Sequence, residues 1–410
     1  MTNLNFIEGN GLAETSTNAP ANFAVSPTAS LMLDSIRGLA AVAVFIGHFL
    51  NAFYVDYASI EDKSRAARAL YSTAGFGLVA VVIFFVLSGF VIGASALRRR
   101  QEHRFTWGGY CRDRVTRLYL VLLPALLLGF LWDQAGMHLF GTAGIYGAHF
   151  GDVVTVPVES TTTWRAYFMN AMFMQKFFAE PAGSNAPLWT LSHEFWCYLA
   201  LPLLFIPQRR WVAGCGVLAA CLLLPKSLGV FAIFWLCGAG VAFTIPLRKQ
   251  AKPQLLLAGL STALFVYTLA ASQFLNNHVS QEAFVVAAAT SLFLFGLVRW
   301  WPREVPRCLT GLKTPAGILA GFSYTLYLTH YPLLVFLAAW FIRRERWQPD
   351  MGSMVRGVTL FGATMLYAYG VSKFTEAHTP TVRRWLSRRS VSNRSGIATM
   401  TIAAQASHSL

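Results

Sequence analysis

Apolar runs of membrane-spanning length recur along most of the chain, and they restrict its fold more than any other feature. A helix needs about 20 mostly apolar residues to cross the hydrocarbon core of a bilayer. Ten candidate runs lie at 33–54, 75–97, 115–133, 188–206, 211–226, 228–246, 255–275, 281–299, 315–342 and 353–375. We therefore predict an all-α integral membrane protein, folded as a bundle of about ten transmembrane helices.

The composition agrees with a membrane protein and argues against a nucleic-acid-binding protein. Hydrophobic residues make up 55% of the chain and charged residues only 12%, whereas soluble proteins carry about a quarter charged residues. The formal net charge is +15, but the basic residues gather between the apolar runs, as they do in the cytoplasmic loops of membrane proteins. This bias predicts that both termini are cytoplasmic. We expect the lipid bilayer as the surrounding partner and no nucleic acid.

Two polar tails and one long loop frame the predicted membrane domain. Residues 1–30 are rich in Ser, Thr, Asn and Ala and lack Lys and Arg, which predicts a flexible tail and not a secretory signal peptide. Residues 387–410 are predicted to form a disordered C-terminal tail. The membrane domain is predicted to span 31–386. Its long external loop, 134–187, contains an apolar but short and charged segment at 164–178, which is expected to be interfacial or re-entrant. The sequence predicts no particular oligomeric state.

The first predicted span carries ionisable residues, which are Asp34 and Arg37 near one end and His48 deep inside. Arg37 and His48 are 11 residues apart. At about 100° per residue a helix brings them to one face, roughly 16 Å apart along its axis. Asp34 and Arg37 are three apart and can pair across a helix face. Because ionisable groups inside a membrane usually face a bundle interior or a wet cavity, we predict that Arg37 and His48 face one enclosed channel. The alternative is a purely structural role, in which His48 forms hydrogen bonds to neighbouring backbone groups and Arg37 extends to the membrane interface.

A second polar cluster precedes the third predicted span. The stretch 98–120 holds seven arginines and ends with Arg114 and Arg117, which share one helix face. Arginine side chains bind phosphate oxygens through pairs of hydrogen bonds. The pair is therefore a candidate seat for a phosphorylated cofactor, with ordinary positive charge on the cytoplasmic side as the alternative.

Two more clusters interrupt later spans. His193 and Glu194 stand near the start of the fourth span, and His330 stands near the middle of the ninth. A buried carboxylate such as Glu194 needs a partner. A metal site built from His48, His193 and His330 is geometrically possible. These three residues have no local ligand spacing, however, and we expect no metal.

Together these clusters resemble acyltransferase family 3, a family of membrane-bound O-acyltransferases. The resemblance covers about residues 31–386 and rests on motifs that follow the family's order: Asp34, Arg37, Gly38 and His48; IFFVLSGFVI (83–92); RVTRLY (114–119); LWTLSHEFWCYLALPLL (188–204); SYTLYLTHYPLL (323–334); and Glu376 at the close of the last span. The chain departs from the family pattern at Val82, Leu120 and Ala377.

The resemblance implies transfer of an acyl group, expected to be acetyl from acetyl-coenzyme A, to a hydroxyl of a carbohydrate. The carbohydrate is expected to be a surface polysaccharide, a lipid-linked sugar or a signalling oligosaccharide, and the location is expected to be a bacterial inner membrane. His48 would act as general base or carry the acyl group covalently. The further implied site residues are Arg37, Asp34 and Glu194 in catalysis, Arg114, Arg117 and Ser88 in donor binding, and His330, Tyr327, His193 and Glu376 in acceptor binding.

Two other function classes suit a polytopic membrane protein. One is a transporter or flippase for a glycolipid or an acylated sugar, in which the intramembrane charges would line a pathway. Ten spans suit this class too, but the sequence shows no repeat symmetry of the transporter kind. The other class is a membrane anchor without chemistry, which the number of intramembrane charges disfavours.

Overall fold

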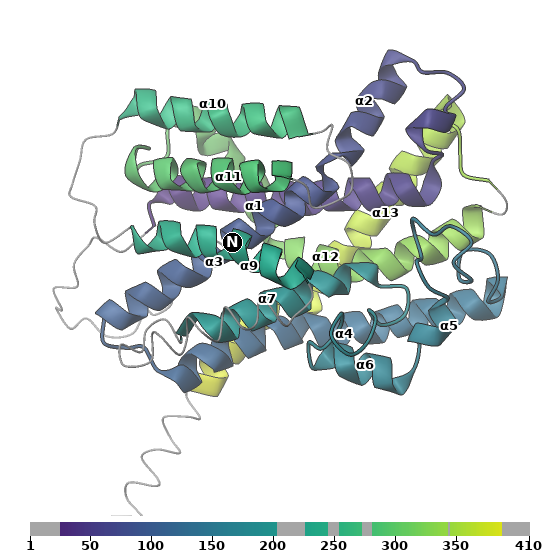
Figure 1. The fold of residues 1–410 in the computed structure, drawn as a ribbon, viewed down its shortest axis with the longest axis horizontal. Helices are drawn as coiled ribbons and strands as arrows, with labels where there is room; N and C mark the ends of the chain where they lie inside the picture. The colour runs from purple at the N-terminus through teal and green to yellow at the C-terminus, as the bar shows by residue number, and fades with distance from the viewer. Residues whose placement is uncertain (1–24, 203–225, 245–253, 273–280, 343–344, 388–410) are drawn as a thin grey trace, which may run out of the picture.

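The computed structural model describes residues 25–202, 226–244, 254–272, 281–342 and 345–387, and this part of the chain folds into helices without a β-strand. Figure 1 shows the arrangement of the helices. Their bounds are α1 Pro27–Phe53, α2 Arg65–Ala74, α3 Phe76–Gln101, α4 Trp107–Phe140, α5 Val158–Thr161, α6 Trp164–Ala171, α7 Trp189–Ala200, α9 Lys226–Phe243, α10 Leu255–Ser272, α11 Gln281–Arg299, α12 Lys313–Phe341 and α13 Met351–Phe374.

The predicted class of an all-helical membrane protein is confirmed. Within the described ranges, five segments are long and apolar enough to cross a membrane by length and composition: Pro27–Phe53, Arg65–Gln101, Trp107–Phe140, Leu255–Ser272 and Gln281–Arg299. Helices coincide with nine of the ten predicted runs. The remaining run, 211–226, lies outside the described residues except for its last position. The count of ten spans and the cytoplasmic location of the termini stay predictions.

The third span is longer than predicted, because the residues before and after the predicted run, 107–114 and 134–140, are helical as well. The Thr106 side chain caps α4 by accepting a hydrogen bond from the Gly109 amide at 3.2 Å, and capping by Thr stabilises a helix start. α4 therefore begins eight residues before the predicted run at 115–133, and it includes Arg112, Arg114 and Arg117. α6, which lies beside α4, covers only the first half of the segment 164–178.

α3 and α9 pack with their backbones in direct contact, and two glycines make this approach possible. A Cβ atom added at Gly89 would lie 1.8 Å from the carbonyl oxygen of Trp235, and one added at Gly238 would lie 1.8 Å from that of Val86. Small residues at helix contacts are typical of membrane bundles. The close approach brings Trp235 Nε1 within 3.3 Å of Ser88 Oγ, to which it donates.

α1 and α12 form the second main contact and run in the same direction. Arg37 donates from Nη2 to the carbonyl oxygen of Ala320 at 2.8 Å, and His48 contacts His330 further along the two helices. Arg37 and His48 thus share the face of α1 that meets α12, as the 11-residue spacing predicted. α12 also packs against α4 and α13 (Figure 1), so it lies inside the bundle.

Candidate active site

A hydrogen-bonded pair of histidines joins α1 to α12. His48 Nδ1 lies 2.9 Å from His330 Nε2, and the two ring planes differ by only 10°. His330 Nδ1 lies 2.7 Å from the carbonyl oxygen of Leu326. Since a carbonyl oxygen only accepts, His330 carries its proton on Nδ1, and its Nε2 accepts from Nδ1–H of His48. This chain of bonds leaves Nε2 of neutral His48 with a free lone pair, which is the form of imidazole that can take a proton.

Aromatic rings hold the pair on its other sides. The Tyr331 ring meets His48 edge to face, with centroids 4.8 Å apart, and Tyr331 donates its hydroxyl to the carbonyl oxygen of Val153 at 2.7 Å. The Phe45 ring packs against His330. His330 is buried with 1% of its surface exposed, whereas His48 is only half-buried. The imidazole with the free lone pair is therefore the more accessible one.

A cavity of about 110 Å³ lies between α1, α3, α4, α7 and α12. Its polar lining contains charged and hydroxyl-bearing side chains that the sequence placed on separate spans. These are Asp34, Arg37, Ser88, Arg117, Thr190, Glu194, Tyr198, Ser323, Tyr324 and Tyr327. Ionisable groups gathered inside a helical bundle are typical of a functional site.

In this cavity, the carboxylate of Glu194 accepts hydrogen bonds from two hydroxyl groups. Ser88 donates to its Oε1 at 2.7 Å, and Tyr198 donates to the same oxygen. Arg117 interacts with Glu194 electrostatically. Tyr198 was not among the predicted site residues, although its place four residues after Glu194 puts it on the same helix face. The partner that a buried Glu194 was predicted to need is thus a hydroxyl pair together with a guanidinium.

Arg37 connects this cavity to the end of the last span. Its Nη2 lies 3.4 Å from Asp34 Oδ1, which confirms the predicted pairing of residues three apart. Glu376 interacts with Arg37 electrostatically. Oε2 of Glu376 accepts hydrogen bonds from the amide and the hydroxyl of Thr325, each at 3.1 Å. Arg37, Asp34 and Glu376 therefore form one charge network between α1 and the segment that follows α13, and Thr325 of α12 donates to it.

The cavity does not form the single channel that was expected to join Arg37 to His48. Arg37 lines it, but neither His48 nor His330 does. Tyr327 lines it, and the centroid of the Tyr327 ring is 6.4 Å from that of His330. The histidine pair thus lies one helical turn beyond the lining residue Tyr327 on α12.

Two more predicted site residues lie away from the cavity lining. His193 is buried among Trp189 and Phe231, and its Nδ1 lies 2.8 Å from the carbonyl oxygen of Trp189. Arg114 packs over the ring of Tyr110 at 5.4 Å, whereas Arg117, one turn further along α4, reaches the cavity. In the part of the chain that the structure describes, no group of three or more His, Cys, Asp or Glu side chains is arranged to hold a metal ion.

The fold and the site define a multi-pass helical membrane protein with a charged internal cavity beside a polarised imidazole. The chain belongs to acyltransferase family 3, because the family model described as an acyltransferase domain matches residues 31–373. The acyltransferase MdmB of Streptomyces mycarofaciens is 32% identical over 338 residues, which cover 74% of this chain and 78% of that protein. Nodulation protein 10 of Rhizobium leguminosarum bv. viciae is 26% identical over 287 residues, which cover 64% and 74% of the two chains. No solved structure matches the chain.

Proposed function

We propose that this acyltransferase moves an acetyl group from acetyl-coenzyme A to a hydroxyl of a carbohydrate at the bacterial inner membrane, with His48 as general base. The observation that carries the proposal is the hydrogen-bond chain from the Leu326 carbonyl through His330 to His48. This chain fixes the tautomer in which Nε2 of His48 is a proton acceptor.

The reaction requires one proton acceptor at the attacking hydroxyl. As the hydroxyl oxygen bonds to the thioester carbonyl carbon, its proton passes to Nε2 of His48. The carbon–sulfur bond then breaks, and the leaving thiolate takes the proton from the imidazolium. His330 keeps its hydrogen bond to His48 throughout and thereby orients the ring.

The arginines and the cavity suit the donor. Coenzyme A carries its phosphates at one end and its thioester at the end of a thin arm. In this proposal the phosphates bind near Arg114 and Arg117, and the arm enters the cavity between α1, α3 and α7. For the acyl group to reach His48, the arm extends past Tyr327, which lines the cavity near His330.

The acceptor class is tested by removing the protein from its host. Surface and secreted glycans from the deletion strain are compared by mass with those of the parent strain and of a strain complemented with His48→Ala. We expect loss of one acetyl mass increment from one glycan in both the deletion and the His48→Ala strains. Unchanged glycans in the deletion strain contradict the carbohydrate acceptor.

His330→Phe is expected to lower kcat of acyl transfer by about 10- to 100-fold, because partners that orient a reactive imidazole contribute on this order. The substitution removes the acceptor for Nδ1–H of His48 and lets the ring adopt either tautomer. KM for acetyl-coenzyme A is expected to stay near the wild-type value, since His330 does not line the cavity. The check is steady-state kinetics over a pH series. An unchanged kcat and pH profile would show that His330 does not orient His48.

A further inference from the structure

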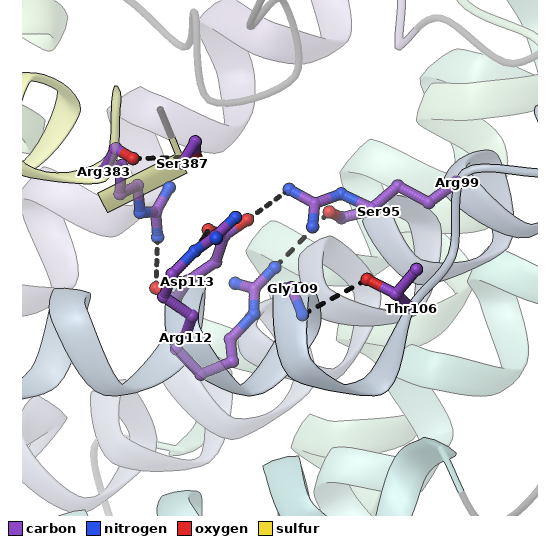
Figure 2. Close-up of polar contacts among 9 residues, drawn as sticks. Ser95, Arg99, Thr106, Gly109, Arg112, Asp113, Arg383 and Ser387 are labelled. Carbon is purple, nitrogen blue, oxygen red and sulfur yellow. Dashed lines mark hydrogen bonds and ion pairs between the residues drawn. The ribbon is translucent and has the colours of Figure 1, made fainter. Parts of the chain in front are cut away.

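Arginine side chains from three segments gather around Asp113 near the N-terminal end of α4 (Figure 2). Arg99, at the end of α3, places Nη2 2.5 Å from Oδ2 of Asp113. Arg383, from the helix at 379–387, donates from Nη2 to the backbone carbonyl oxygen of Asp113 at 2.7 Å. Arg112 Nε lies 3.9 Å from Oδ1 of the same carboxylate. The last segment before the C-terminal tail is thereby tied to the base of α4.

The cluster holds more positive than negative charge. Arg99 and Arg112 pair with the carboxylate of Asp113, Arg383 binds only its backbone carbonyl oxygen, and Arg114 stands beside them. Burial, and after it the charge of Arg114, lowers the pKa of Arg383 to about 9 even with Asp113 beside it. Like charges held this close favour the arrival of an anion.

Arg114 supplies hydrogen-bond donors that lack a partner. The residue is 5% exposed, and its Nε and Nη1 atoms are buried without an acceptor. Its Nη2 donates to Ser95 Oγ at 3.4 Å, a long bond. Leaving a buried charged donor unpaired is costly. An anion with several oxygens would accept from these nitrogens.

The cluster is partly exposed on one side, and it lies one helical turn from the cavity on the other. The side chains of Arg99 and Arg112 are 34% and 29% exposed, so a ligand can reach them. Arg117 lines the cavity and interacts electrostatically with both Arg114 and Arg383. One turn of α4 thus separates the unpaired nitrogens of Arg114 from the cavity lining.

We infer that Arg99, Arg114 and Arg383 form a phosphate-binding site, and that the helix at 379–387 completes this site. Guanidinium groups bind phosphate oxygens through paired hydrogen bonds. The phosphate belongs either to the nucleotide part of the acyl donor or to the headgroup of an anionic lipid. The first source rests on the proposed function, whereas the phosphate chemistry does not.

The test measures binding to the full-length protein in a neutral detergent by titration calorimetry, with inorganic pyrophosphate and with coenzyme A as separate ligands. Arg383→Gln is expected to weaken both affinities by about tenfold or more, since a hydrogen bond to a charged group contributes on this order. Arg384→Gln is the matched control, because Arg384 is the exposed neighbour. Arg383→Lys keeps the positive charge but loses the paired hydrogen bonds of the guanidinium, so it is expected to lose less affinity than Arg383→Gln. Equal affinities for Arg383→Gln and Arg384→Gln, with equal melting temperatures, overturn the site.

Vesicles distinguish the two sources of phosphate. Loss of coenzyme A binding by Arg383→Gln in phosphatidylcholine vesicles supports the nucleotide source. If only phosphatidylglycerol binding depends on Arg383, the site holds a lipid headgroup. Pyrophosphate binding that depends on Arg383, in a protein that consumes no acetyl-coenzyme A, supports the site and contradicts the proposed function. If the protein transfers acetyl groups but the binding of these ligands does not depend on Arg383, the proposed function is supported and the phosphate site is contradicted.

Discussion

His48→Ala is expected to lower acyl transfer by about 10²- to 10⁴-fold, the contribution typical of a general base, in protein that stays in the membrane at its normal level. The side chain is half-buried, donates to His330 and packs against the ring of Tyr331, so the amount of folded protein is measured together with the rate. The measurement is the rate of thiol release from acetyl-coenzyme A in purified vesicles. His138→Ala is the control, because His138 is an exposed histidine within a helix and is expected to leave the rate unchanged.

His48→Asn separates proton acceptance from hydrogen bonding. The amide nitrogen of Asn can take the place of Nδ1 and still donate to His330 Nε2, but the side chain offers no basic atom at the position of Nε2. The expected loss of rate is therefore as large as for His48→Ala. An active His48→Asn enzyme would remove His48 from the proton transfer and leave it a role in joining α1 to α12.

Gly89→Ala is expected to damage the fold severely. Its Cβ would lie 1.8 Å from the carbonyl oxygen of Trp235, a backbone atom that moves only if α9 moves. Overpacking of this kind typically costs about 1–3 kcal/mol and occasionally more. Because Trp235 donates to the neighbouring Ser88, the shift also disturbs the cavity. The measurement is the thermal unfolding midpoint in detergent, together with the amount of protein in the membrane.

Gly77→Ala provides a matched control on the same helix. No atom lies within 4 Å of the Cβ that this substitution would add. Replacing an unconstrained helical glycine by alanine is expected to be neutral or to stabilise by about 0.5–1 kcal/mol. The two alanine substitutions should thus change the unfolding midpoint in opposite directions or by very different amounts. Equal midpoints for both would show that α3 and α9 do not pack as described.

Hydrophobic run length predicted the helices well, because a membrane span is limited by thickness and apolar character. It predicted the ends less well, since capping decides them. Thr106 starts α4 in a polar stretch that a hydropathy pattern passes over. Local spacing also predicted the contact between Asp34 and Arg37, which depends on one helix face alone.

Contacts between distant spans could not be derived from spacing. His48 and His330 are 282 residues apart, and no pattern along the chain relates them. Family resemblance singled out both residues without indicating that they bond. It placed them in different roles, with His48 as base and His330 at the acceptor. In the structure the two rings are hydrogen-bonded to each other, and the proposed function therefore gives them one shared role.

The adjacent residues His193 and Glu194 show the limit of reading a motif as one site. Successive helical residues differ in direction by about 100°, so two neighbours seldom face the same cavity. Glu194 lines the cavity, whereas His193 is hydrogen-bonded to the carbonyl oxygen of Trp189 and packs among aromatic rings. Arg114 and Arg117 share a face, but one turn of helix separates the arginine cluster from the cavity.

The most direct test of the account uses purified protein in vesicles, isotopically labelled acetyl-coenzyme A, and glycans extracted from the deletion strain. Thiol release and the mass of the glycans are followed in the same reaction. We predict that label appears on a glycan hydroxyl in step with thiol release, and that His48→Ala lowers both to the same large extent. Folded wild-type protein that moves glycans across the vesicle membrane without consuming the thioester would contradict acyl transfer and support the transporter.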